Sequence, residues 1–222
     1  MPISTIFFDL DDTLYSSACG LWGAIRDRMG RYMVDVLGMP EADVPEIRRD
    51  YFQRYGTTLR GLQIHHRVDT DDYLAYVHDL PLPEYIAPDP AVRSLVAGLP
   101  QPRFIFTNAD AAHAGRVLAR LELTDLFPRI IDIRALEWAC KPEPLAYRRA
   151  LQIAGGPPPE ECLMIDDSPA NLAPARQLGL TTVLVSAVGG RDPTLSEHPA
   201  ASFTIPTLTD LPQVLPELWA VR

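Results

Sequence analysis

The chain has 222 residues, 47% of them hydrophobic, which is enough for one substantial core and a smaller appended module. Its net charge of -9 argues against a nucleic-acid partner, and no apolar run is long enough for a membrane span. Because no signal-like segment precedes the first predicted strand, we expect a cytoplasmic protein. Cys19, Cys140 and Cys162 are scattered and odd in number, so they are expected to be buried free thiols.

The first predicted strand, residues 3–8, ends in three carboxylates. Its apolar run suits a central strand buried on both faces, so Asp9 falls at the carboxyl end, where open α/β sheets bind ligands. An extended backbone would point the Asp9 and Asp11 side chains to the same side. Two unit charges about 4 Å apart repel by roughly 4 kcal/mol at an effective dielectric of about 20, so this pair needs a cation, a shared proton or another geometry. The alternative is that Asp11, Asp12 and Thr13 only form a turn and cap a helix.

The long interval before the second predicted strand is helical. Apolar residues recur at helical spacing over residues 21–37, and the proline-rich stretch 81–90 is the clearest boundary in the chain. Three further helices are predicted between them, at about 43–55, 57–66 and 69–77. We therefore expect a small all-helical unit over residues 15–88, inserted into a core formed by residues 1–14 and 89–222.

Strands alternate with helices over the rest of the chain. The predicted strands are residues 103–106, 129–133, 161–165, 181–185 and 202–205. The predicted helices are residues 90–98, 110–121, 143–154 and 208–219, and a loop is expected around Gly189 and Gly190. Each connection is long enough for a right-handed crossover, so the pattern predicts an α/β fold: a parallel Rossmann-like sheet covered by helices on both faces.

Polar residues also stand at the ends of later strands or at the start of helices. Thr107 and Asn108 follow the strand at 103–106, where taken alone they would cap the next helix. Lys141 precedes a proline-started helix, whose positive end attracts anions, although a solvated surface lysine is the ordinary alternative. The strand at 161–165 ends in the paired acids Asp166 and Asp167.

In this order, the four groups resemble the four motifs of the haloacid-dehalogenase-like phosphohydrolase superfamily. Its first motif, an aspartate two residues before a second aspartate and four before a threonine or valine, is here Asp9-Leu10-Asp11-Asp12-Thr13. The resemblance implies that Asp9 attacks phosphorus, and that Asp11 protonates the leaving oxygen and then activates water. A carboxylate suffices because phosphoryl transfer needs an in-line nucleophile and charge neutralisation more than a strong base. The resemblance also implies that the inserted helices form a cap over the site.

The other motifs imply the remaining roles. Thr107 donates its hydroxyl to a phosphate oxygen, while Lys141 neutralises both the Asp9 carboxylate and the phosphate. The residues expected to bind phosphate are Asp9, Leu10, Asp11, Thr107, Asn108 and Lys141. Mg²⁺ is the implied cofactor, since it prefers oxygen ligands; the implied ligands are the carboxylates of Asp9 and Asp166 and the backbone carbonyl of Asp11. The residues expected around these ligands are Asp12, Asp167 and Asn171.

The cap suggests a branch of the superfamily. An acid at the position of Asp11 favours a phosphatase or phosphomutase, because a released halide needs no proton. The segment from Tyr55 to Leu62, followed by His65, resembles the pyrimidine 5'-nucleotidase branch, although Ala109 stands where that branch usually has glycine. This resemblance implies hydrolysis of nucleoside 5'-monophosphates through an aspartyl-phosphate intermediate, with Tyr55, Arg60 and His65 near the base or sugar. Those three residues would otherwise be core or solvated side chains.

Other functions remain open at this point. A sugar-phosphate phosphatase or phosphomutase of the same superfamily would use the same motifs on a different substrate. A noncatalytic phosphate-binding protein would have no need of both a nucleophile and an acid, so the pair Asp9 and Asp11 argues against it. The expected partner is a small phosphate monoester, with no nucleic acid and no membrane, and the chain is expected to be a monomer or a homodimer.

Overall fold

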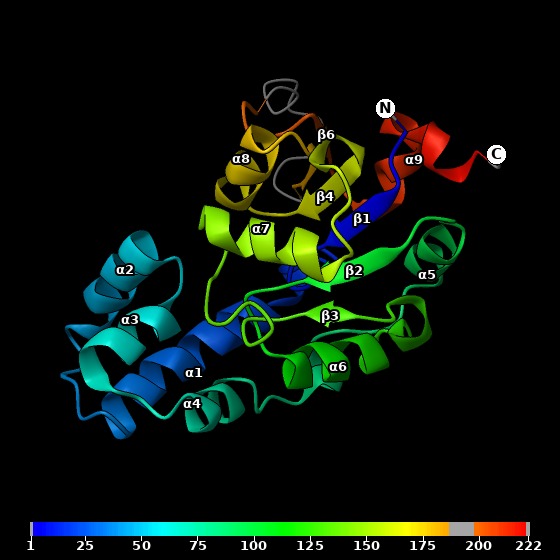
Figure 1. Cartoon of the computed structure of the whole chain (residues 1–222). Helices are drawn as coiled ribbons and strands as arrows, with labels where there is room; N and C mark the ends of the chain where they lie inside the picture. The colour runs from blue at the N-terminus through cyan, green and yellow to red at the C-terminus, as the bar shows by residue number, and fades with distance from the viewer. Residues whose placement is uncertain (1, 187–197, 221–222) are drawn as a thin grey trace.

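The computed structural model describes residues 2–186 and 198–220, and its centre is a parallel sheet. The six strands are β1 (Thr5–Phe8), β2 (Arg103–Phe106), β3 (Ile130–Ile131), β4 (Cys162–Asp166), β5 (Thr181–Val185) and β6 (Phe203–Ile205). They lie in the order β3-β2-β1-β4-β5-β6, and every neighbouring pair is parallel. The predicted α/β class and parallel sheet are therefore confirmed (Figure 1). The loop predicted around Gly189 and Gly190 lies outside the described residues.

The register of the central strands creates the edge on which the predicted site depends. Phe8 is paired with Ile105 on one side and with Ile165 on the other. The residues that follow Phe8 and Ile105, and Asp166 at the end of β4, therefore meet at one edge of the sheet. All residues of β1 and β4 are buried, as expected for strands covered on both faces.

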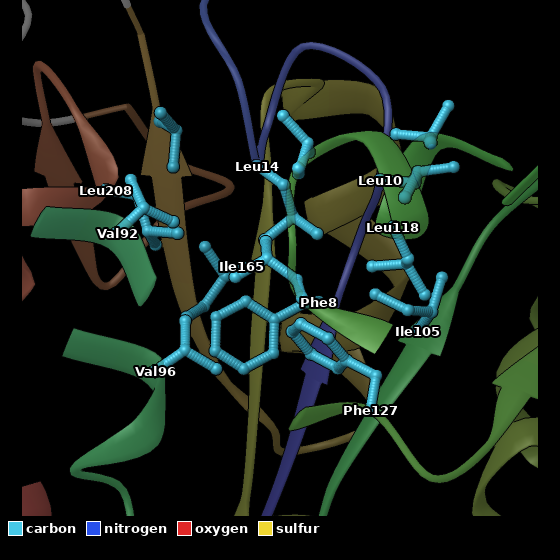
Figure 2. Packing of buried hydrophobic residues seen from close by; sticks show 14 of the residues in the cluster. Phe8, Leu10, Leu14, Val92, Val96, Ile105, Leu118, Phe127, Ile165 and Leu208 are labelled. Atoms are coloured by element: carbon cyan, nitrogen blue, oxygen red, sulfur yellow. The ribbon is translucent and has the colours of Figure 1, made fainter. Parts of the chain in front are cut away.

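Helices from the later part of the chain cover the two faces of the sheet. On one face, α5 (Pro90–Ala97) and α6 (Ala111–Arg120) share an apolar cluster with Phe8, Ile105 and Ile165, which Figure 2 shows from close by. On the other face, α7 (Pro144–Ile153) and α8 (Pro169–Gln177) pack with Phe7 and Met164. Neighbouring residues of β1 thus belong to different clusters, which is the alternation a strand imposes.

The four helices between β1 and β2 are α1 (Leu21–Asp35), α2 (Val44–Tyr55), α3 (Thr58–His66) and α4 (Thr70–Val77). They build an apolar cluster of their own, in which the rings of Tyr32 and Tyr73 meet edge to face at 5.0 Å. Ile133 and Cys140 join this cluster from the sheet side, while the start of α1 packs with the sheet cluster. In Figure 1 these helices lie together, beyond one edge of the sheet.

Some predicted elements differ from the structure. The single helix predicted at 208–219 is wrong: the chain forms a 3-10 turn at Leu208–Asp210, α9 (Leu211–Val214) and a second 3-10 turn at Pro216–Trp219. Pro216 causes the break, because a residue before proline avoids the helical region, and Leu215 has φ -139° and ψ 58°. The strand predicted at 129–133 shrinks to two residues, and α8 was not predicted.

Two smaller predictions can be compared with the structure as well. All three cysteines are free, but Cys19 is partly exposed where a buried thiol was expected. In the described ranges, none of the helices combines the length and the apolar character that crossing a membrane requires.

Candidate active site

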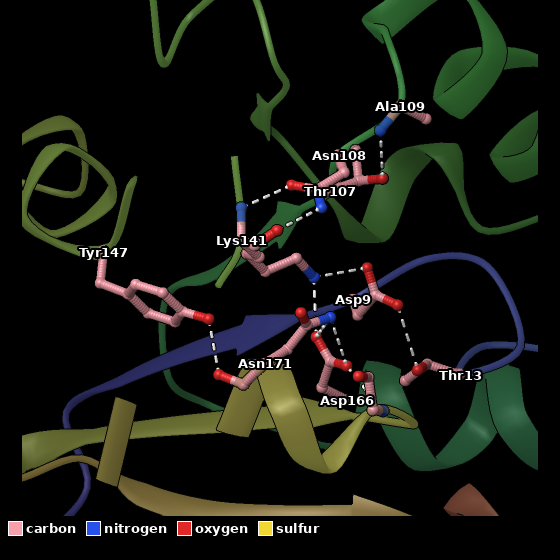
Figure 3. Close-up of polar contacts among 10 residues, drawn as sticks. Asp9, Thr13, Thr107, Asn108, Ala109, Lys141, Tyr147, Asp166 and Asn171 are labelled. Carbon is pink, nitrogen blue, oxygen red and sulfur yellow. Dashed lines mark hydrogen bonds and ion pairs between the residues drawn. The ribbon is translucent and has the colours of Figure 1, made fainter. Parts of the chain in front are cut away.

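Asp9, the predicted nucleophile, directly follows β1. Its N–H donates to the carbonyl of Ile165 at 2.9 Å, which extends the sheet pairing by one residue and fixes the position of the carboxylate. The hydroxyl of Thr13 donates to Asp9 Oδ2 at 3.4 Å, and the turn between them is closed by the N–H of Leu14 on the carbonyl of Leu10 at 3.0 Å. Thr13 therefore supports the carboxylate besides belonging to a turn (Figure 3).

Lys141 is the only lysine of the chain, and its side chain is 1% exposed. Its ammonium donates to Asp9 Oδ1 and to Asp166 Oδ2, both at 2.7 Å (Figure 3). The alternative of a solvated surface lysine is excluded by this burial. Burial lowers the pKa of Lys141, but the carboxylates of Asp166 and Asp9 outweigh that effect and raise it above its ordinary value, so the ammonium is charged.

The backbone of Lys141 is held by Asn108, which lies just after the end of β2. The side-chain oxygen of Asn108 accepts from the N–H of Lys141 at 2.8 Å, and the Asn108 amide donates to the carbonyl of Lys141 at 2.9 Å. This reciprocal pair joins the second and third predicted motifs, which are 33 residues apart in the chain. Asn108 thus has a structural role in addition to the predicted one toward phosphate.

Thr107 follows β2 and is 2% exposed. Its hydroxyl oxygen accepts from the N–H of Ala109 at 3.0 Å, which leaves the hydroxyl hydrogen free to donate into the cavity that Thr107 lines. The alternative that Thr107 and Asn108 cap the next helix is wrong. Asp110 is the N-cap of α6, and its carboxylate accepts from the N–H of His113 at 3.3 Å.

Asp166 ends β4 and is completely buried. Its carboxylate accepts from the N–H of Ser168 at 2.8 Å and from the amide of Asn171 at 3.0 and 3.2 Å, besides Lys141. The backbone carbonyl of Asn171 in turn accepts from the Tyr147 hydroxyl at 2.6 Å. Asn171, expected around the metal ligands, therefore contacts and orients the Asp166 carboxylate.

Three carboxylates form the candidate metal site. Oxygens of Asp9, Asp166 and Asp167 lie within 4.8 Å of one another. Burial raises the pKa of Asp9, Lys141 opposes this, and Asp166 and Asp167 raise it further. Burial, followed by the charges of Asp166 and Asp12, raises the pKa of Asp167 to about 7. The single positive charge of Lys141 does not balance the negative charge of three carboxylates. All ligand atoms that the cluster offers are oxygens, so the residues fit Mg²⁺. Asp167 was predicted only to surround the metal ligands, but its carboxylate belongs to the same oxygen cluster as the predicted ligands Asp9 and Asp166.

Asp11 has a separate set of partners. Its Oδ1 accepts from the Tyr15 hydroxyl at 2.6 Å and pairs with Nε2 of His113 at 3.0 Å. Burial alone would raise the pKa of Asp11, but His113 and then Tyr15 lower it to about 2, so the carboxylate is ionised. The His113 ring stacks on His78 at 4.1 Å, and His78 Nδ1 lies 3.2 Å from Asp110 Oδ1.

Sequence reasoning missed Tyr15 and His113. Tyr15 stands two residues after the first motif, and His113 is separated from Asp11 by 102 residues. No local pattern signals that contact. His113 lies in the first turn of α6, which begins just after the polar end of β2, and only the packing of that helix against the sheet brings the ring to Asp11.

A cavity of about 590 Å³ lies over these groups. The core supplies its floor, including Asp9, Asp11, Thr107, Lys141 and Asp167. The helices between β1 and β2, called the cap below, contribute another part of its lining, the cap wall, which includes Trp22, Arg26, Arg48, Phe52 and Tyr73. The arrangement places a buried carboxylate, a free hydroxyl donor and an ammonium around one space, which suits a reaction at an oxyanion.

The predicted substrate-selecting residues of the cap do not line this cavity. The hydroxyl of Tyr55 contacts Nε2 of His65 at 2.8 Å, and Arg60 donates to Gln63 at 3.3 Å. That part of the prediction is corrected, because α3 turns its start, including Thr58 and Leu59, toward the cavity.

Comparison with known proteins identifies the family of this chain. The family model of haloacid dehalogenase-like hydrolases matches residues 3–179, and the chain belongs to this family of hydrolases. Phosphate metabolism protein 8 of Saccharomyces cerevisiae is 27% identical over 192 residues, which cover 80% of this chain and 60% of that relative.

Solved structures share the fold. A HAD phosphatase from Thermococcus onnurineus is 20% identical with a TM-score of 0.64, covering 97% of this chain and 98% of that one. L-2-haloacid dehalogenase from Xanthobacter autotrophicus is also 20% identical, with a TM-score of 0.61 and coverage of 96% and 98%. These two neighbours catalyse different reactions by their names, so the fold by itself does not choose between them.

Proposed function

We propose that the protein is a Mg²⁺-dependent phosphatase that hydrolyses phosphate monoesters, with pyrimidine nucleoside 5'-monophosphates as its substrates. The observation that carries the proposal is the buried Lys141 ammonium, bonded to both Asp9 and Asp166 beside the Thr107 hydroxyl. These groups provide a nucleophile and two donors for phosphate oxygens around one cavity.

The reaction proceeds in two steps. In the first, a carboxylate oxygen of Asp9 forms a bond to phosphorus while the bond from phosphorus to the ester oxygen breaks, and Asp11 protonates that leaving oxygen. In the second, water attacks phosphorus, Asp11 takes a proton from it, and inorganic phosphate leaves with the Asp9 carboxylate restored. Lys141 and the Thr107 hydroxyl hold the phosphate oxygens throughout. A Mg²⁺ ion at Asp9, Asp166 and Asp167 would supply the positive charge that a phosphate anion requires beside these carboxylates.

Asp11 is held ready for the second step, because its pKa of about 2 makes it a carboxylate in the free protein. Its acid role in the first step needs a proton, and a monoanionic phosphate ester carries one to the site. This built environment for Asp11 favours a phosphatase over a dehalogenase, since a departing halide needs no proton.

Two further observations support the substrate. The name of the yeast relative connects it with phosphate metabolism, although that protein is longer than this chain. The cap segment from Tyr55 to Leu62 resembles the pyrimidine 5'-nucleotidase branch, and part of it, Gly56 to Leu59, lines the cavity.

The test is phosphate release from uridine, cytidine and purine monophosphates, sugar phosphates and p-nitrophenyl phosphate. Each is assayed with Mg²⁺ or EDTA, and with Asp9→Asn as the inactive control. We expect Mg²⁺-dependent release that is strongest on the pyrimidine nucleotides and absent in Asp9→Asn. Preference for sugar phosphates would retain the mechanism and replace the substrate, and transfer to a second hydroxyl would indicate a phosphomutase. Absence of turnover on every ester would favour the noncatalytic phosphate-binding alternative.

A further inference from the structure

The cap wall of the cavity carries two buried donors that lack partners among the described residues. Tyr73 is 1% exposed, and its hydroxyl has no hydrogen-bond partner in the part of the chain that the structure describes. Arg48 Nε is likewise buried without a partner within that part. Both residues line the cavity above the catalytic carboxylates. Buried polar groups normally make hydrogen bonds. Two buried donors without acceptors at a cavity wall therefore point to a ligand that supplies the acceptors.

Two aromatic side chains belong to the same wall. Trp22 and Phe52 are 38% and 56% exposed, although large aromatic side chains usually bury most of their surface, and both line the cavity. An aromatic face binds a flat ring by stacking, and stacking tolerates any planar base. Another cap residue, Arg26, also lines the cavity, and its charge lowers the pKa of Asp12 against the effect of burial.

We propose that Arg48 and Tyr73, flanked by Trp22 and Phe52, recognise the planar, acceptor-rich leaving group of the substrate, as the carbonyl-bearing ring of a pyrimidine nucleoside would provide. The inference deepens the proposed function, on which it rests, by naming the residues that select the leaving group. Arg48 offers donors only, so a leaving group without acceptors would leave both buried groups unpaired and would bind less well.

The test compares uridine monophosphate with phenyl phosphate, whose ring carries no carbonyl. We expect the ratio of kcat/KM for the two esters to fall roughly 3- to 10-fold in Tyr73→Phe, and roughly 10- to 100-fold in Arg48→Met, where a charged donor is lost. Tyr73→Phe keeps the ring that packs on Tyr32, so its fold should be retained, and its melting temperature checks this.

The matched controls are Tyr55→Phe and Arg60→Met, which change the same side-chain types outside the cavity and should leave the ratio unchanged. A ratio that is unchanged in both Arg48→Met and Tyr73→Phe overturns the inference while phosphatase activity stands. The inference is also overturned if the protein prefers a substrate with a second phosphate over uridine monophosphate and Arg48→Met removes this preference. In that case Arg48 binds an anionic group of the substrate.

A binding measurement separates this inference from the proposed function. Calorimetry in the Asp9→Asn background compares uridine monophosphate with inorganic phosphate and needs no turnover. If no ester is hydrolysed by the unmodified protein, the proposed function fails. The inference still stands if Tyr73→Phe raises the Kd of uridine monophosphate roughly 3- to 10-fold without raising that of phosphate, and it fails if the two ligands lose affinity equally.

Discussion

Lys141 shows at the residue scale how one buried charge organises the site. Taking an ammonium and two carboxylates out of water is costly, and the cost is offset only when geometry and hydrogen bonds are good. Both contacts of Lys141 are 2.7 Å, and its backbone is fixed through Asn108. Removing one partner of such a group leaves the remaining charges uncompensated.

We therefore expect Lys141→Met to abolish turnover and to lower the free energy of unfolding by about 3–5 kcal/mol, because two buried carboxylates lose their counter-charge. Urea unfolding followed by circular dichroism measures this. The control is Arg93→Met, which removes the exposed pair of Arg93 with Asp125 and should leave the free energy of unfolding nearly unchanged. Equal losses in both variants would contradict the role assigned to the buried pair.

Asp11 gives a second prediction at this scale. Tyr15→Phe removes the 2.6 Å bond to its carboxylate, and bonds to charged groups contribute about 1.5–3 kcal/mol. We expect kcat/KM to fall about 10- to 100-fold for esters with poor leaving groups, whose departure needs a well-placed Asp11. The fall should be smaller for p-nitrophenyl phosphate.

The comparison of esters distinguishes positioning from a general loss of structure. Tyr55→Phe is the control, since its hydroxyl contacts His65 outside the cavity. If Tyr15→Phe reduced the rates of good and poor leaving groups by the same factor, Tyr15 would act only on the fold.

At the element scale, the contact between α2 and α3 positions the cap wall of the cavity. Gly61 of α3 faces Tyr51 of α2 so closely that a Cβ at Gly61 would overlap the Tyr51 ring. Only a glycine allows this approach of the two helices. Phe52, which lines the cavity, is the neighbour of Tyr51 on α2, so the packing at Gly61 also sets where the aromatic wall stands.

Gly61→Ala should therefore destabilise the protein by about 1–3 kcal/mol through overpacking, measured by thermal or urea unfolding. Gly115→Ala in α6 is the matched control, since a Cβ there meets nothing within 4 Å. That change should be neutral or stabilise by up to about 1 kcal/mol, because alanine has the higher helix propensity. Similar destabilisation in both variants would contradict the packing argument.

At the scale of the whole molecule, the active site joins strand ends that are far apart in the chain. Asp9, Asp166 and Asp167 come from two strands that meet only in the folded sheet. A cation that binds them stabilises the folded state, since the unfolded chain has no such cluster.

Mg²⁺ at about 100 times its Kd should add about 2.7 kcal/mol of stability and raise the melting temperature by several degrees, an effect that EDTA reverses. Differential scanning fluorimetry measures the shift. Asp167→Asn should reduce it, while Asp79→Asn, which changes an exposed acid on the cap side, should not. A shift of the same size in Asp167→Asn would remove Asp167 from the metal site.

The class of fold and the order of the site groups could be predicted from the sequence alone. Parallel strands buried on both faces leave apolar runs in the sequence, and their carboxyl ends must meet at one edge, so Asp9, Thr107 and Asp166 could be placed together from local patterns. Proline and glycine likewise marked most helix ends.

The cap residues that face the site and the residues that hold Asp11 could not be predicted in this way, because both depend on how the helices pack in the folded protein. A helix presents residues all around its axis, and the face that turns inward depends on its packing with other helices. Arg48 and Tyr73 line the cavity for that reason, whereas the predicted Arg60 does not. His113 reaches Asp11 only because α6 packs against the sheet, a contact across 102 residues that no local pattern encodes.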